Sequence, residues 1–96
     1  MKPSEALDRH RDEIRRVVSE HHSRNPRVFG SALHGDDSET SDLDLLIDPA
    51  PGMSLLDLAR MQNRLQQILG ISVDILTPGS LPESYRDRIL SEAHPV

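Results

Sequence analysis

The 96-residue chain contains no cysteine and very few aromatic side chains: one Phe, one Tyr and no Trp. The absence of cysteine excludes disulfides, thiolate metal sites and cysteine nucleophiles. With so few aromatic residues, the hydrophobic core has to be aliphatic and thin. A chain of this length has room for one small domain, so we expect residues 1–96 to form a single domain whose core a partner or a dimer could complete.

Long apolar runs are also missing. None approaches the roughly 18 residues that a membrane span needs, and the N-terminus has no apolar segment of the signal-peptide type. Acidic residues outnumber basic ones by 16 to 11, which gives a formal net charge of −5 and argues against a generally basic nucleic-acid-binding protein. We therefore expect a cytoplasmic protein that contacts neither membranes nor nucleic acid directly.

Pro and Gly residues divide the chain into alternating helical and extended segments. Apolar residues recur at helical spacing in some segments and at every second position in others. The expected elements, in chain order, are a helix over 4–23, an extended segment over 27–29, a short helix after Ser31, a strand over 43–48, a helix over 54–69, a strand over 71–76 and a last helix from Ser80. Ser4 is the expected N-cap of the first helix.

This order predicts an α/β fold with a small mixed sheet of three or four strands packed against helices. Because a helix joins strands 43–48 and 71–76, these two are expected to be parallel. The segment over 27–29 can pair antiparallel with the strand over 43–48. Ser54 with Asp57, and Ser80 with Glu83, have the spacing of capping boxes.

Three aspartates are the first candidates for chemistry. Asp42 and Asp44 stand at positions i and i+2, so in a strand they point the same way. Two carboxylates on one face repel unless a cation lies between them, and Mg²⁺ prefers oxygen ligands. If strand 71–76 lies beside strand 43–48, Asp74 can join the cluster. Three carboxylates can hold two Mg²⁺ ions in the arrangement used for in-line phosphoryl transfer.

Gly30 and Ser31 are the second half of the predicted site. Gly30 has no Cβ, so a phosphate can approach the backbone closely. The Ser31 hydroxyl and backbone N–H can donate to phosphate oxygens at the start of a short helix. Arg24 and Arg27, just before this pair, are further candidates for contacts with a triphosphate, whereas Asp36, Asp37 and Glu39 are expected in a solvated loop.

Each of these pieces is common by itself in turns and solvated loops, but their order, strand context and spacing occur together here. The pattern Gly-Ser, ten residues, Asp-x-Asp and a later strand Asp resembles the minimal nucleotidyltransferases of the DNA-polymerase-beta-like superfamily. The similarity covers nearly the whole chain and includes Ser41 and the closing segment over 81–93. One departure is His34, which stands where relatives often have an Arg shortly after Gly-Ser, so weaker phosphate neutralisation is expected there.

The resemblance implies that Asp42, Asp44 and Asp74 bind Mg²⁺ and act in catalysis, and that Gly30, Ser31 and Ser41 bind the nucleotide. It further implies an antitoxin that transfers AMP from ATP to a tyrosine hydroxyl of a HEPN-type ribonuclease toxin, with which it forms a hetero-oligomer.

Two other functions remain open from the sequence. The first is an antitoxin with a weakened catalytic site that occludes its toxin, and the second is nucleotidyl transfer to a small molecule. The leucine-rich helix over 54–69 and the tail over 85–96 are candidate partner surfaces, although most of the helix's apolar stripe is expected to face the sheet.

Overall fold

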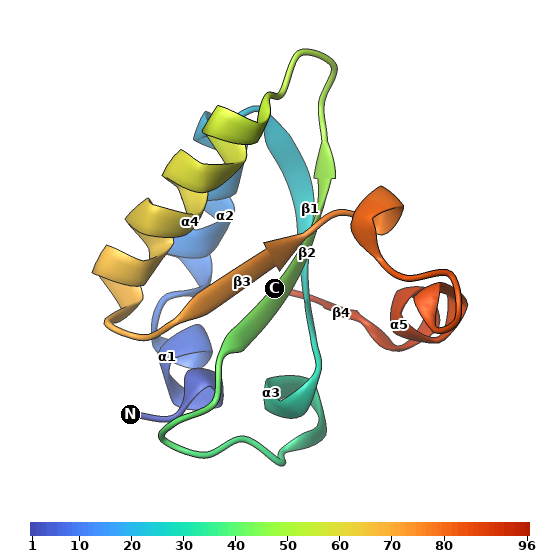
Figure 1. Ribbon diagram of the computed structural model, residues 1–96. Coiled ribbons are helices and arrows are strands. Elements are labelled where there is room, and N and C mark those ends of the chain that lie inside the picture. Colours follow the sequence, from blue (N-terminus) through green and yellow to red (C-terminus); the bar gives the residue numbers. More distant parts are fainter.

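A computed structural model describes all residues, 1–96, and its centre is a four-stranded mixed sheet with helices on both sides (Figure 1). The strands are β1 (Ser23–Phe29), β2 (Leu43–Pro49), β3 (Val73–Leu76) and β4 (His94–Pro95), in the spatial order β3-β2-β1-β4. β2 runs antiparallel to β1 and parallel to β3, as the sequence predicts, and β4 pairs antiparallel with the other side of β1.

The helices divide between the two faces of this sheet (Figure 1). Figure 1 shows one layer made of α1 (Pro3–Arg9), α2 (Arg11–Glu20) and α4 (Leu55–Leu69). The opposite side carries the 3₁₀ turn η1 (Pro78–Ser80) and α5 (Arg86–Glu92). The short α3 (Ser31–His34) lies at the end of β1, where Ala32 and Leu33 pack against the main core and His34 faces α5. The predicted α/β class is confirmed. No helix is long and apolar enough to span a bilayer.

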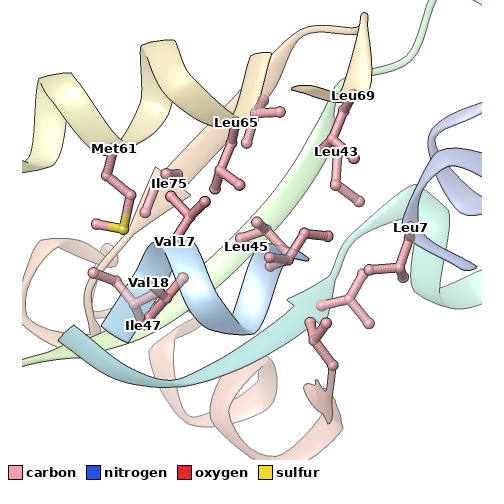
Figure 2. Packing of buried hydrophobic residues seen from close by; sticks show 14 of the residues in the cluster. Leu7, Val17, Val18, Leu43, Leu45, Ile47, Met61, Leu65, Leu69 and Ile75 are labelled. Carbon is pink, nitrogen blue, oxygen red and sulfur yellow. The ribbon is translucent and has the colours of Figure 1, made fainter. Parts of the chain in front are cut away.

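The main hydrophobic core lies between the sheet and the layer of α1, α2 and α4 (Figure 2). The strand alternation sends Leu43, Leu45 and Ile47 of β2 into this core, where α4 supplies Met61 and Leu65. A smaller cluster of Phe29, Leu46 and Leu81 lies on the other face, beneath α5. Both faces of β2 are therefore covered over Leu45–Ile47, whereas Asp44 near its start and Asp48 near its end are only partly buried.

The N-terminal helix differs from the prediction in its length and its cap. His10 leaves the helical conformation and its Nδ1 lies 2.7 Å from the Glu13 carboxylate, so the predicted helix over 4–23 is two helices. Lys2, not Ser4, is the N-cap of α1. The second helix ends at Glu20, because His22 adopts a left-handed conformation with φ of 58°.

Strand β1 is longer than predicted and includes Asn25 and Pro26, which were expected to end a helix. The pairing with β2 shifts register between Arg24 and Arg27, and Asn25 has a φ of 55°. A bulge of this kind accommodates a proline, which has no N–H to donate, inside a sheet. The Pro26 carbonyl accepts the N–H of Val96, and this hydrogen bond holds β4 against β1. The sequence did not predict β4.

The ends of α4 follow the sequence, whereas the turn before α5 does not. Ser54 and Asp57 form the expected capping box, and Gly70 ends the helix in a left-handed conformation. At the next turn, Ser80 pairs with Thr77 instead of Glu83, so α5 begins at Arg86 and not near Ser80. The reason is Pro78, whose fixed φ favours the start of a 3₁₀ turn directly after Thr77.

The outer edge of β3 is covered by two side chains of α4. The amide oxygen of Gln66 accepts the N–H of Val73 at 3.1 Å, and that of Gln62 accepts the N–H of Ile75 at 3.4 Å. These N–H groups point away from β2, so an exposed strand edge would otherwise leave them to water or to another chain. The helix that joins β2 to β3 thereby also closes the sheet.

Asp37 fastens the loop over 36–41 to the first helix. Its side chain is 8% exposed and accepts the backbone N–H of Ser4 at 2.8 Å. This hydrogen bond lowers the pKa of Asp37 below its usual value of 3.8. Asp37 was expected in a solvated loop, and that expectation is wrong because an unpaired N–H at the start of α1 takes its carboxylate as a cap.

We expect Asp37→Ala to lower the free energy of unfolding by about 1 kcal/mol at pH 7, the usual effect of losing a helix cap. Since the pKa of Asp37 is lower in the folded state, this stabilisation is present above pH 3.8 and is lost as the pH falls below it. Urea unfolding at pH 7 and pH 2.5 measures both effects. Asp36→Ala, at the exposed neighbouring residue, is the control, and an equal loss in both variants would contradict the assignment.

Candidate active site

The predicted aspartates lie on the sheet face that carries α5, near the end of β1 where α3 begins. Asp44 is directly opposite Asp74 in the parallel β2–β3 pair and opposite Phe29 in the antiparallel β1–β2 pair. Asp42 precedes β2 by one residue, and alternation places it on the same face as Asp44. The fold therefore puts Asp44 between the end of β1 on one side and Asp74 on the other.

Gly30 brings the second predicted half of the site against the first. An ideal Cβ on Gly30 would lie 2.3 Å from Oδ2 of Asp44, so the backbone between β1 and α3 is in direct contact with the carboxylate. Gly30 has a φ of 73° and a ψ of −151°, a conformation that is almost confined to glycine. Both constraints explain why this position requires a glycine, independently of any ligand.

The electrostatics of the site centre on Asp44. This side chain is partly buried, whereas Asp42 and Asp74 are exposed. Burial, together with the negative charges of Asp74 and Asp42, raises the pKa of Asp44 from 3.8 to about 6. The three carboxylates are thus close enough to repel, and a cation among them would relieve that repulsion. As they lie, no three acidic or histidine side chains already stand at the spacing of ligands around one metal ion.

The two predicted serines each follow or precede one half of the site in the chain: Ser31 follows Gly30, and Ser41 precedes Asp42. Ser31 is the first residue of α3, directly after Gly30. The Ser41 hydroxyl accepts the N–H of Ser38 at 2.9 Å, so this side chain fixes the turn that leads into Asp42. The loop between α3 and β2 is therefore held at both ends: Asp37 is hydrogen-bonded to α1, and Ser41 is hydrogen-bonded to Ser38 next to the site.

Arg27 and Asp48 make a separate cluster on the same face. The Arg27 guanidinium lies 2.6 Å from the Asp48 carboxylate, which also accepts the Asn25 amide at 3.0 Å. Asp48 is paired with Arg24 in the sheet register, near the opposite end of β1 from Gly30. The idea that Arg24 or Arg27 contacts a triphosphate is not supported by this geometry, because Arg27 is already paired and Arg24 lies at the far end of the strand.

Comparison with known proteins identifies the fold and the family. The sequence model of a family described as "Nucleotidyltransferase domain" matches residues 9–96. The chain belongs to this nucleotidyltransferase family. The predicted enzyme class is thereby confirmed.

Individual relatives agree with this assignment. A Methanocaldococcus jannaschii protein, provisionally named a protein adenylyltransferase, is 40% identical over 77 residues, which are 80% of this chain and 83% of that protein. The protein adenylyltransferase MntA of Thermococcus cleftensis is 33% identical over 86 residues, 90% of this chain and 84% of that protein.

Two solved structures share the fold. One, provisionally described as a minimal nucleotidyltransferase, has a TM-score of 0.87 and 38% identity and covers 97% of this chain and 95% of its own. The other was solved as a toxin-antitoxin with AMP-PNP, with a TM-score of 0.74 and 16% identity, covering 88% of this chain and 69% of its own. The resemblance to minimal nucleotidyltransferases that the sequence indicates is confirmed by the first.

We expect Gly30→Ala to destabilise the protein by about 2–3 kcal/mol, because a methyl group collides with the Asp44 carboxylate and the backbone conformation excludes it. Gly35→Ala is the matched control. Gly35 has a similar φ of 76° but open space around the added carbon, so only about 1 kcal/mol of backbone strain is expected there. Chemical unfolding compares the two, and equal losses would contradict the close contact at Gly30.

Asp44→Asn is expected to make the protein more stable at pH 8. The unfolded chain releases the Asp44 proton near pH 3.8 and the folded chain near pH 6, so the folded state binds more protons between these values and loses stability as the pH rises through them. We expect the variant to exceed the wild type by about 1–2 kcal/mol at pH 8, after allowance for solvent screening, and by nothing at pH 3. Urea unfolding across this range, with Asp36→Asn as control, measures the difference.

Proposed function

We propose that this protein is a Mg²⁺-dependent protein adenylyltransferase that transfers AMP from ATP to a tyrosine hydroxyl of a HEPN-type toxin and so acts as its antitoxin. The observation that carries the proposal is the alignment of Asp44 with Asp74 next to Gly30, in a chain whose relatives are named as protein adenylyltransferases. The structural neighbour solved as a toxin-antitoxin with AMP-PNP motivates the choice of partner and of nucleotide.

The carboxylates fit a hard divalent cation. Their only donor atoms are oxygens, and the burial of Asp44 and the charges of Asp74 and Asp42, which together raise its pKa, disfavour a carboxylate there without a cation. Asp42 and Asp44 would hold two Mg²⁺ ions, and Asp74 would complete the coordination on the acceptor side. When bound, the metal neutralises charge on the transferring phosphate and on the attacking and leaving oxygens. Mg²⁺ should also lower the pKa of Asp44, because its positive charge favours the ionised form.

The chain's own groups would position the reactants. Gly30 brings its backbone against Asp44 without a side chain, Ser31 would donate to the triphosphate oxygens, and Ser41 holds the turn that leads into Asp42. The tyrosine hydroxyl oxygen attacks the α-phosphorus, the bond from that phosphorus to the α,β-bridging oxygen breaks, and pyrophosphate leaves. Asp74 accepts the hydroxyl proton or passes it to water. AMP on the toxin adds bulk and negative charge where RNA phosphates would bind.

A second function is favoured by one observation at the α3–α5 junction. His34, which stands where relatives often have an arginine, lies 3.2 Å from the Glu92 carboxylate and is thus engaged with α5. A protein with reduced phosphate neutralisation could instead inhibit its toxin by binding over its active site. In that case the three aspartates would not be needed to inhibit the toxin.

Intact-mass measurement of the toxin after incubation with this protein, ATP and Mg²⁺ tests the proposal. A HEPN-type protein from an adjacent reading frame, recognised by an Arg-x₄-His motif, is the acceptor. We expect one or more added AMP groups, and at least a hundred-fold slower transfer with Asp42→Asn/Asp44→Asn, because the metal ligands are lost.

The double variant Asp36→Asn/Asp87→Asn removes the same charge from exposed positions and is expected to transfer AMP normally. A stable complex without any mass gain would overturn the adenylyltransferase proposal for that pair and favour inhibition by occlusion. Neither a complex nor a mass gain would overturn both candidate functions for that acceptor.

A further inference from the structure

A cavity of about 440 Å³ opens between α3 and α5, directly beside the proposed nucleotide site. Gly30 and His34 line it from the α3 side, and Tyr85, Arg88 and Glu92 line it from the α5 side. Because Gly30 lies against the Asp44 carboxylate, the cavity adjoins the region of the three aspartates, although none of them lines it. Its size is within the usual range of small-molecule sites.

Arg88 is the cation in this cavity that remains available to a ligand. The negative charge of Glu92 faces His34, at 3.2 Å, across the junction of α3 and α5. By contrast, the Arg88 side chain is exposed and forms no ion pair or side-chain hydrogen bond; the backbone carbonyl of Arg88 accepts the Ser91 hydroxyl.

Two neighbouring arginines already have partners. Arg27 is paired with Asp48 at 2.6 Å, and Arg86 donates to the Leu81 carbonyl at 2.7 Å. A nucleoside triphosphate brings several negative charges into a region that already contains Asp42 and Asp44. Metal ions compensate part of this charge, and a free guanidinium is well suited to the phosphate oxygens that remain.

The order of the strands indicates which part of the nucleotide reaches Arg88. Asp74 lies on β3 and Gly30 follows β1, so these residues stand on opposite sides of Asp44. In-line displacement at phosphorus requires the attacking and leaving oxygens to lie on opposite sides. With the acceptor hydroxyl on the Asp74 side, pyrophosphate leaves on the Gly30 side, toward the cavity.

We propose that Arg88 binds the β- and γ-phosphates of the nucleoside triphosphate in this cavity and supplies, from α5, a positive charge that α3 does not. This inference rests on the proposed function and deepens it, since it assigns a substrate-binding residue outside the predicted set. Because the β- and γ-phosphates leave as pyrophosphate, Arg88 also stabilises the negative charge that develops on this leaving group. The nucleoside and the α-phosphate lie outside its reach.

Calorimetric titration of a non-hydrolysable ATP analogue and of AMP, both with Mg²⁺, tests this assignment. We expect Arg88→Gln to weaken binding of the analogue about ten-fold or more, the range for a lost charge-assisted hydrogen bond, and to change AMP binding less than two-fold. Arg88→Lys should retain part of the affinity. Arg60→Gln, an exposed position on α4, removes the same charge elsewhere and should leave both affinities unchanged.

Three other outcomes would contradict the assignment of Arg88 or the proposed function. Equal weakening of both ligands would place Arg88 at the nucleoside or the α-phosphate and overturn the assignment. Unchanged nucleotide affinity with a raised KM for the acceptor would make Arg88 an acceptor contact, which also overturns it. If the wild-type protein bound no nucleotide, the proposed function itself would fail, and that result is distinct from any effect of the Arg88 variants.

Discussion

The contact between Gly30 and the Asp44 carboxylate is the constraint on which the site depends. It fixes the distance between β1 and β2 at the point where the chain turns into α3, and only a residue without a side chain permits it. The same contact excludes water from one side of Asp44, which contributes to its raised pKa. A single backbone position thus controls both the shape of the candidate site and the charge of its central carboxylate.

Most of the hydrophobic packing that stabilises the fold lies on the opposite face of the sheet from this contact. Aliphatic packing on the α2 and α4 side of the sheet stabilises β2 along its length, while the opposite face has only a small cluster beneath α5. Asp42 and Asp74 are thereby carried on a firm strand pair but remain exposed to solvent. This division lets carboxylates that repel one another persist, because the core supplies the stability that their proximity costs.

Much of the fold followed from local chemistry in the sequence. The alternation of apolar and polar residues over 43–48 predicted which face of the sheet Asp44 lies on. The Ser54–Asp57 pair and Gly70 predicted the two ends of α4. Features that depend on long-range contacts could not be predicted from the sequence. β4 forms because the end of the chain meets β1 at Pro26, and Asp37 is buried because it caps α1. Arg88 escaped notice for the same reason, since no spacing in the sequence relates α5 to Gly30.

The glutamines of α4 have a consequence for recognition. Since Gln62 and Gln66 occupy the outward N–H groups of β3, and the opposite edge strand β4 is two residues long, the sheet offers no long free ladder to an incoming strand. Backbone pairing of that kind is largely indifferent to sequence, because it reads amide groups common to all proteins. A protein partner must therefore be selected by its side chains, so single substitutions at the surface can alter which partner is bound.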